Sequence, residues 1–393
     1  MKKLLILNGG YSEIPLITAA KSEGYYVIVI GNNENAPGNL LADEYCRIDY
    51  SDKEAVCKIA TEKMVEGIVS ACNDRAYESK VYSMAKLRMA THDSMQVVNQ
   101  LHNKNEFRNL EQLLGIPTPA YTEVHSSNEL NAMDNISYPI LVKPINMDGG
   151  RSVAKCWGED ELRNTYCSFR IAHPNTGYVV EEFLEGTNHG FTTLIKNQKV
   201  IFFMADIEYH SYYDYAVSAV SVPSMLDKDT EHEMVRQIEV ISSSLNLSDG
   251  LMHAQFILTE RGPYILEICR RPPGDLYIEF VKYVTGIDYP LAIVSSEIGD
   301  MKIRFLHKPK ENVIARQVLI CQEKGRIKKI KYSLEFERHI KEKYEYYDKE
   351  RTLNGEMYKC GVVFLETETH TEMYELLTNI KEHISFDMIQ GEN

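Results

Sequence analysis

The sequence lacks the features that mark secreted, membrane-spanning and nucleic-acid-binding proteins. No apolar run among its 393 residues is long enough to cross a membrane, and the apolar start at Lys3–Leu7 is too short for a signal peptide. The net charge of -14 argues against nucleic acid or an anionic membrane as the main partner. The eight cysteines include no C-x-x-C pair, so we expect reduced thiols in a cytoplasmic protein rather than disulfides or a zinc site.

The dinucleotide-binding fingerprint is also missing. An apolar strand at Lys3–Leu7, the turn at 8–10, a helical pattern at 14–23 and a strand at 27–30 form a βαβ unit, which begins a doubly wound parallel sheet. The turn reads N-G-G rather than G-x-G-x-x-G, so an NAD(P)-dependent oxidoreductase is poorly supported. Asn73-Asp74 ends the next predicted strand, where open α/β sheets bind ligands, although an ordinary turn explains this pair equally well.

The stretch from Tyr138 to Val153 combines a lysine with a run of small residues. The apolar run at 140–142 predicts a buried strand that carries Lys143, and the turn D-G-G-R-S follows at 148–152. Glycine permits close backbone approach, so N–H groups and a hydroxyl can surround an anion there. The stretch therefore indicates either a phosphate-binding loop beside a phosphate-neutralising lysine or an ordinary hairpin with an exposed loop.

The remaining periodicity predicts an α/β chain that changes character near residue 300. Lys104 lies in a helical pattern at 97–114, which Gly115 and the prolines after it end. Further helices are predicted at 53–63, 77–87, 160–169, 230–245 and 371–384, and strands at 67–70, 177–180, 191–195, 200–206, 251–258, 264–269, 313–321 and 361–366. A tyrosine-rich segment at 209–215 suits a substrate-facing loop or a packed surface loop.

Four features follow one another in a set order. They are Lys104 before G-I-P-T-P, Lys143 with its glycine turn, the acidic and hydrophobic hinge at 181–186, and two late strands that read HAQFIL and YILEICRRPPGD. In this order the chain resembles, over nearly its whole length, the ATP-grasp superfamily of carboxylate–amine ligases, which includes biotin carboxylase, the carbamoyl phosphate synthetase large chain, purine-pathway ligases and L-amino acid ligases. The resemblance implies a mixed α/β and α+β fold. It comprises a doubly wound parallel-sheet domain at 1–98, an ATP-grasp domain of two α+β subdomains at 99–299, and a small α+β domain at 300–393.

The resemblance assigns ATP binding to several parts of the chain. Lys104 and Lys143 match the two lysines of the fold that contact the ATP phosphates. The residues that match the flexible phosphate loop are Asp148, Gly149, Gly150, Arg151 and Ser152. The residues of the segment that matches the adenine-reading hinge are Glu181, Glu182, Phe183 and Leu184. For the two glutamates of this segment, a solvated strand end is the alternative.

The last motif implies the catalytic and metal-binding residues. Glu267 matches a carboxylate that binds magnesium, a cation that prefers oxygen ligands and phosphate partners. Arg271 matches the arginine that stabilises the transferred phosphoryl group, so Arg271 and Lys143 are the expected catalytic residues. The alternative for Glu267 is a structural salt bridge with Arg270 or Arg271.

Three positions depart from the family pattern. Gln255 stands where the first metal-binding glutamate is usual, Cys269 where an asparagine is usual, and Asn188 where a glutamate commonly contacts the ribose. An amide oxygen still ligates magnesium but removes one negative charge, and a thiol is a poor magnesium ligand. Gln255 is retained as a metal ligand and Asn188 as a cofactor-binding residue. His253, beside this strand, suits a structural role or a role in proton transfer.

The resemblance implies an ADP-forming ligase that uses ATP and Mg²⁺ and passes through an acyl phosphate. Its expected partners are a small-molecule carboxylate, such as an amino acid, and an amine, with no nucleic acid and no membrane. A homodimer is compatible, because relatives are often dimers. The three departures support an alternative, a non-catalytic or degenerate ATP-grasp module that binds nucleotide for regulation.

Overall fold

The chain forms two compact units in the computed structural model, which describes residues 2–89, 92–127, 129–132, 136–145, 153–174 and 176–389. The first unit comprises Met1–Thr91, Met204–Met225 and Arg271–Asn393, and the second comprises His92–Phe203 and Leu226–Arg270. The predicted phosphate loop at 148–152 lies outside the described residues. The predicted division into three domains stays a prediction.

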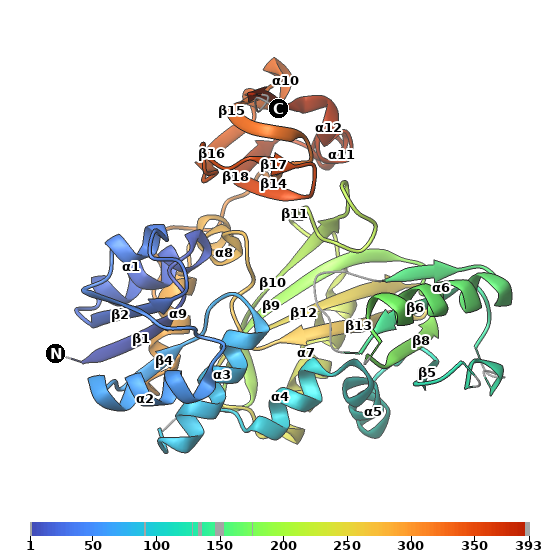
Figure 1. The fold of residues 1–393 in the computed structure, drawn as a ribbon, viewed down its shortest axis with the longest axis horizontal. Helices are drawn as coiled ribbons and strands as arrows, with labels where there is room; N and C mark the ends of the chain where they lie inside the picture. Colours follow the sequence, from blue (N-terminus) through green and yellow to red (C-terminus); the bar gives the residue numbers. More distant parts are fainter. Residues whose placement is uncertain are drawn as a thin grey trace. The chain divides into compact units, whose positions relative to one another are not determined.

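The first unit begins with a four-stranded parallel sheet in the order β3–β2–β1–β4 (blue in Figure 1). The elements of this region are β1 (Lys3–Leu7), η1 (Tyr11–Glu13), α1 (Ile14–Ser22), β2 (Tyr26–Gly31), η2 (Pro37–Leu40), β3 (Glu44–Arg47), α2 (Lys53–Lys63), β4 (Gly67–Val69) and α3 (Asp74–Lys86). Alternate residues of β1 and β2 form a buried core with α2 and α3. The residues between them are buried as well, so both strands are buried along nearly their whole length, as in parallel sheets that helices cover on both faces.

The rest of the first unit is antiparallel sheet with flanking helices. Its strands follow the orders β10–β11–β14–β18–β16 and β17–β15–β19. The elements are the end of β10 (Lys199–Tyr209), β11 (Ala219–Val222), α8 (Tyr277–Thr285), α9 (Tyr289–Ser296), β14 (Val313–Cys321), β15 (Lys324–Tyr332), α10 (Leu334–Glu337), β16 (Ile340–Glu345), β17 (Leu353–Asn354), β18 (Tyr358–Thr367), α11 (His370–Thr378), α12 (Ile380–His383) and β19 (Ile384–Ile389). Leu319, Val363 and Leu377 are fully buried in the core of this region.

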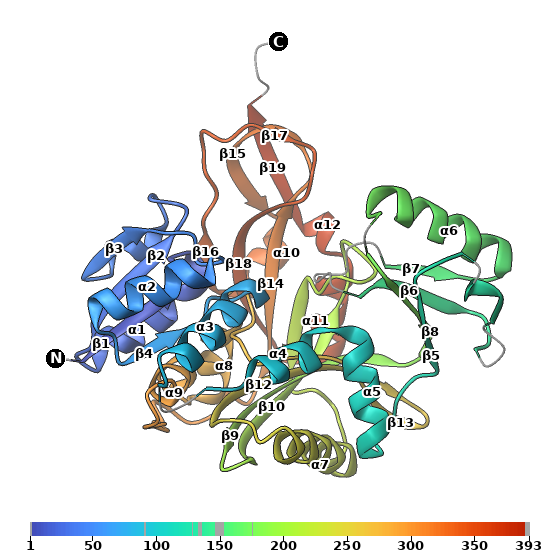
Figure 2. The ribbon, with the colours of Figure 1, turned by 60° about the horizontal axis from the view of Figure 1, so that its bottom comes forward.

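The second unit contains a small antiparallel sheet in the order β5–β8–β6–β7. Its elements are β5 (Tyr121–Val124), η3 (Glu129–Ala132), β6 (Ile140–Pro144), β7 (Ala154–Cys156), α6 (Glu159–Ala172) and β8 (Tyr178–Glu182). Helix α6 lies across one face of the sheet (Figure 2), where Leu162 and Tyr166 pack against Ile140, Val142 and Val180. This packing fixes β6 and β8, which carry Lys143 and Glu181.

A second antiparallel sheet in this unit has the order β13–β12–β9–β10. The elements are α4 (Met95–His102), α5 (Lys104–Leu114), β9 (Thr187–Lys196), the first part of β10, α7 (Lys228–Ser244), β12 (Gly250–Thr259) and β13 (Gly262–Cys269). Helices α4 and α7 both contact β13. None of the helices in the described part of the chain is long and apolar enough to cross a membrane.

The parallel sheet near the N-terminus and the antiparallel sheets after it agree with the predicted fold class. Two predicted helices are wrong in detail. The pattern at 97–114 is two helices, because Asn103 is extended (φ -93°, ψ 115°) and separates α4 from α5. The pattern at 371–384 also breaks, at Asn379, and its last residue, Ile384, begins strand β19.

Candidate active site

Gln255 and Glu267 lie directly opposite each other on the neighbouring strands β12 and β13. Side chains alternate along a strand, so paired residues share a face of the sheet. Phe256, the next residue after Gln255, is fully buried on the other face, whereas Glu267 is exposed. The structure therefore places the two predicted metal ligands together on the open face of this sheet.

A β-bulge sets this pairing. Gln255 pairs with Glu267 but Phe256 pairs with Ile265, so Leu266 is an extra residue on β13. Such bulges are frequent next to active sites, where they redirect side chains. In an uninterrupted ladder Leu266 would pair with Gln255, and Glu267 would pair with Ala254 on the other face of the sheet.

The side chain of Arg108, from helix α5, satisfies the backbone of the bulge. Its Nη1 donates to the Ile265 carbonyl (2.8 Å) and its Nη2 to the Leu266 carbonyl (3.2 Å). The same guanidinium donates through Nε to Glu181 (3.2 Å) and through Nη1 to Glu111 (2.7 Å). Arg108 is 2% exposed, so four acceptors share one fully buried cation. This network joins α5, β8 and β13.

The two carboxylates on Arg108 differ in their protonation. Burial alone would raise the pKa of Glu181, but Lys143 and Arg108 outweigh it and lower this pKa to about 2. Burial raises the pKa of Glu111 to about 7, against the opposite effect of Arg108. Among the described residues, Oε1 of Glu111 has no hydrogen-bond partner, which adds to the cost of its charge. Glu181 is thus the firmly ionised partner of the network.

Lys143 forms an ion pair with Glu181. Glu181 lies opposite Leu141 in the β6–β8 ladder, so Lys143, two residues further along β6, is its diagonal neighbour on the same face. The side chain of Lys143 is 12% exposed. The predicted phosphate-binding lysine is therefore held in place by a buried carboxylate before any nucleotide binds.

Lys104 is the first residue of α5, four positions before Arg108. Residues four apart lie on one face of a helix. Lys104 therefore projects from the same face of α5 that carries Arg108 towards Glu181 and β13. Arg108 thus links α5, which carries Lys104, to Lys143 of β6 through their shared partner Glu181.

The predicted hinge begins with the last two residues of β8 and lines a small pocket. Glu182 and Phe183 border a cavity of about 320 Å³ together with Ala120, Tyr138 and Pro139. The N–H of Glu182 donates to the Ala120 carbonyl (2.8 Å), and that of Phe183 to the Pro139 carbonyl (3.2 Å). Two of the hinge N–H groups are therefore engaged within the unit, and the adenine-reading role of this segment stays a prediction.

The three departures from the family pattern lie on or beside one sheet face. Asn188 pairs with Ile257, two residues from Gln255, so both belong to the open face. Cys269 pairs with His253 on the same face. Cys269 is partly exposed and His253 is buried. A thiol and an imidazole thus accompany the oxygen ligands of Gln255 and Glu267.

Arg271 belongs to the first unit, where its Nε donates to Oδ1 of Asp74 (2.8 Å). Asp74 is the first residue of α3, and Asn73 caps this helix by accepting from the N–H of Ala76 (3.0 Å). Arg270, in the second unit, pairs with Asp93 (3.0 Å). Asp93 is thus a partner of Arg270 and Asp74 a partner of the predicted catalytic arginine, and the role of Glu267 stays a prediction.

The side-chain oxygens on the open face are suitable ligands for one magnesium ion that phosphate groups also bind. Glu267 offers a carboxylate and Gln255 an amide oxygen, and a hard cation takes such ligands together with phosphate oxygens and water. Within the described ranges, no three His, Cys, Asp or Glu side chains gather as a metal site. Phosphates would therefore have to supply most of the negative charge around the ion.

Comparison with known proteins identifies one domain of the chain. Residues 102–275 match the family model of the ATP-grasp domain. These residues include Lys104, Lys143, Gln255, Glu267 and Arg271. This part of the chain is an ATP-grasp domain, and the resemblance and fold class predicted from the sequence are confirmed.

Solved structures share this fold over the whole chain. The L-amino acid ligase from Bacillus licheniformis matches with a TM-score of 0.80 at 19% identity, covering 100% of this chain and 99% of that one. The phosphoribosylglycinamide synthetase from Anaerococcus prevotii matches with a TM-score of 0.77 at 21% identity, covering 99% and 100%. The biotin carboxylase domain dimer of the Hydrogenobacter thermophilus 2-oxoglutarate carboxylase, solved with MgADP and bicarbonate, has a TM-score of 0.77 at 17% identity and covers 98% and 91%.

Replacing Arg108 with leucine is expected to destabilise the second unit by roughly 3–5 kcal/mol, because two buried carboxylates lose a cation. The matched control is Arg236→Leu, which removes an arginine paired with Glu233 at the surface and is expected to cost at most about 1 kcal/mol. Urea unfolding followed by the fluorescence of Trp157, the single tryptophan, measures both. Equal losses in the two variants would contradict a central role for Arg108.

Glu111 is expected to make stability fall as the pH rises. Its folded pKa is raised to about 7, so its contribution is fully present below its ordinary pKa and is lost as the pH rises through 7. Glu111→Gln cannot ionise, so it is expected to gain roughly 1–3 kcal/mol relative to the parent chain between pH 5 and pH 8. Urea unfolding across this range measures the difference.

The control for this experiment is Glu106→Gln, on the exposed side of the same helix, which is expected to follow the parent profile. Glu181 contributes no slope in this window, because its pKa is lowered and its contribution is lost only in strong acid. A constant difference between Glu111→Gln and the parent chain from pH 5 to pH 8 would refute the assignment.

Proposed function

We propose that this protein is an ATP-dependent, ADP-forming ligase that joins a carboxylate to an amine through an acyl phosphate. The observation that carries the proposal is the pairing of Gln255 with Glu267 on an open sheet face, beside a network that holds Lys143. These residues lie within an ATP-grasp domain. The fold shared with an L-amino acid ligase, a phosphoribosylglycinamide synthetase and a biotin carboxylase domain supports the same class of reaction.

In this proposal Lys104 and Lys143 bind the phosphates of ATP. Each contributes one positive charge from a different element, α5 and β6, so together they can neutralise a triphosphate from two sides. Lys143 would exchange Glu181 for a phosphate oxygen, and Glu181 would keep Arg108 as its partner.

Gln255 and Glu267 would hold Mg²⁺, and the ion would withdraw negative charge from the transferred phosphoryl group. Cys269, a poor magnesium ligand, would lie beside them. One carboxylate and one amide make a site with a single negative charge. Magnesium would therefore bind mainly as its complex with ATP, which agrees with the MgADP found in the biotin carboxylase domain.

The reaction proceeds in two displacements. A carboxylate oxygen of the substrate attacks the γ-phosphorus, and the bond from that phosphorus to the β–γ bridging oxygen breaks, which releases ADP. The amine nitrogen then attacks the acyl carbon, the bond to phosphate breaks, and phosphate leaves while the nitrogen loses a proton. Arg271 would stabilise the transferred phosphoryl group, and positioning with charge neutralisation supplies most of the rate.

A nucleotide-binding module without turnover is the second candidate. The position of Gln255 favours it, because this residue pairs with Glu267 where a second carboxylate would otherwise complete the metal site. The two candidates differ in one measurable property. A ligase releases ADP when its carboxylate and amine are present, whereas a module binds ATP and releases none.

Purified protein with Mg²⁺-ATP is expected to release ADP when it receives one member of a panel of amino acids and small carboxylic acids. Lys143→Ala and Glu267→Ala are each expected to lower this rate at least about 100-fold, since both remove a charge that acts in phosphoryl transfer. A coupled assay for ADP measures the rate. Gln255→Glu is expected to lower the magnesium concentration at half-maximal rate, because it adds a negative charge to the metal pair.

The matched control is Lys199→Ala, which removes a lysine paired with Glu239 (2.7 Å) at the surface of the same unit and is expected to keep full activity. Normal rates in both Lys143→Ala and Glu267→Ala would disprove these residue roles. ATP binding without ADP release from any pool, with turnover absent even in Gln255→Glu, would favour the module.

A further inference from the structure

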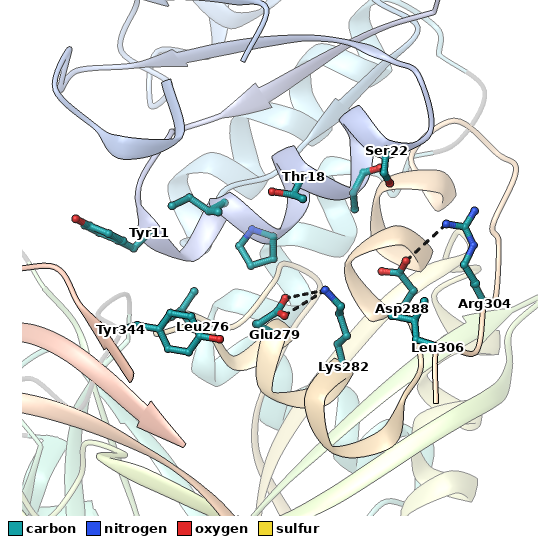
Figure 3. Close-up of a pocket in the computed structure, with 13 residues that line it drawn as sticks. Tyr11, Thr18, Ser22, Leu276, Glu279, Lys282, Asp288, Arg304, Leu306 and Tyr344 are labelled. Atoms are coloured by element: carbon teal, nitrogen blue, oxygen red, sulfur yellow. Dashed lines mark hydrogen bonds and ion pairs between the residues drawn. The ribbon is translucent and has the colours of Figure 1, made fainter. Parts of the chain in front are cut away.

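The first unit contains a cavity of about 460 Å³ that none of the proposed ATP-site residues lines. Its walls are one face of α1, the start of α8, the segment at 304–306, and Tyr344 of β16 (Figure 3). The volume lies within the range of small-molecule sites, about 300–1,000 Å³. The cavity is therefore large enough for a ligand of its own.

A close backbone contact keeps the cavity formed. Gly286 has a φ of +73°, and a Cβ there would lie 2.0 Å from the carbonyl oxygen of His307. Next to this contact, the N–H of Leu306 donates to the Gly286 carbonyl (2.7 Å), and the N–H of Asp288 donates to the Arg304 carbonyl (2.8 Å). Arg304 and Leu306 are thus fixed at the cavity wall without any ligand.

One part of the lining is apolar. Pro15 and Ala19 are buried on the α1 side, and Leu276 is 4% exposed on the α8 side. Ile14 and Leu306 extend this surface. A hydrocarbon side chain that covered these groups would be removed from water together with them, which favours binding.

Two ion pairs occupy the other part of the lining. Lys282 donates to Glu279 over 3.1 Å, and Nη1 of Arg304 lies 3.9 Å from Oδ2 of Asp288. Figure 3 shows each cation beside its carboxylate, with Tyr11 and Tyr344 at the opposite end. Nη2 of Arg304 is paired with Glu23, whereas Nη1 lies beyond hydrogen-bond distance of Asp288, so Nη1 is the part of the guanidinium that a ligand group can reach.

These two pairs define the charge of a suitable ligand. A simple anion would meet the carboxylates of Glu279 and Asp288, and a simple cation would meet Lys282 and Arg304. A ligand that carries both an ammonium and a carboxylate group can pair with the carboxylates and with the cations of the lining. Together with the apolar lining, this selects a small zwitterion with a hydrocarbon side chain.

The cavity also touches the segment that follows Arg271. Leu276 lines the cavity, and both Asp275 and Leu276 have positive φ values, 54° and 58°. Non-glycine residues in this region are held there by their surroundings. The N–H of Asp275 donates to Oγ of Ser12 (3.0 Å), the neighbour of the cavity residue Tyr11. A ligand against Leu276 therefore contacts a constrained segment that leads back to Arg271.

We propose that this cavity is a second binding site, for a small zwitterion with an apolar side chain such as an amino acid or dipeptide, and that its occupant regulates the chain through Leu276. The class matches the substrates or products of an amino acid ligase. The regulatory part rests on the proposed function, whereas the binding part does not.

Calorimetric titration of the full chain without nucleotide tests the binding part, with L-phenylalanine and L-leucyl-L-leucine as probes. Both are expected to bind. N-acetyl-L-leucyl-L-leucine and L-leucyl-L-leucine amide each lack one charge and are expected to bind at least about tenfold more weakly, since a hydrogen bond to a charged group is lost. Lys282→Gln and Arg304→Gln are expected to weaken the binding of L-leucyl-L-leucine by a similar factor.

Two further variants locate the binding. Thr18→Trp places a large ring in the cavity from α1 and is expected to abolish binding. The control is Arg236→Gln, which removes an ion pair in α7 with the same i, i+3 spacing as Lys282–Glu279 and is expected to leave binding unchanged. Absence of binding by both probes would overturn the proposal. So would equal binding by the charge-blocked ligands, or unchanged binding in all three cavity variants.

The regulatory part is tested by the rate of ADP release with the ligase substrates present. A saturating concentration of either probe is expected to change the rate of ADP release at least about twofold in the parent chain. The rate of the Lys282→Gln variant is expected to stay the same when the probe is added. Binding without any change in rate would overturn regulation alone. If the chain releases no ADP with any substrate, the proposed function fails and regulation fails with it, while the titration still decides whether the cavity binds zwitterions.

Discussion

The candidate site depends on one buried guanidinium. Arg108 has five N–H donors in a fixed planar arrangement, and it uses them on two carboxylates and two backbone carbonyls. A lysine could not reach four acceptors from one position. Because two of these acceptors are the carbonyls of a β-bulge, the same side chain that balances Glu181 also fixes the register of Glu267. The charge balance of this network and the register of the predicted metal ligand therefore depend on one side chain.

The sequence predicted the elements of this site well, because strands and helices with strong periodicity follow local rules. It placed β6, β8, β12 and β13, and it named Lys143, Gln255 and Glu267, whose roles stay predictions. It did not identify Arg108 or Glu111, since a charged residue on a helix is usually exposed and only the tertiary contacts of α5 bury these two. The spacing of Lys104 and Arg108 on one helix face was the available signal. The break at Asn103 was missed because a single extended residue leaves hydrophobic periodicity almost unchanged.

The pairing of Asp74 with Arg271 was beyond any local rule. These residues are 197 positions apart, and only the folded first unit brings them together. The sequence suggested a ligand position or an ordinary turn at Asn73-Asp74, and the structure shows Asn73 as a helix cap beside a carboxylate that holds an arginine. A residue whose partner is distant in the chain shows no pattern by itself, so the sequence could name Arg271 only through its resemblance to a family.

The state of Lys143 before nucleotide binding follows from the same charge balance. A charged lysine in a partly buried site needs a counter-charge when no ligand is bound, and Glu181 supplies it. If a phosphate binds Lys143 as proposed, the buried charge of Glu181 needs a second cation to balance it. Arg108 is that cation. The arrangement lets Lys143 change partners without leaving a buried charge alone, so the cost of releasing it is smaller than that of breaking an isolated buried pair.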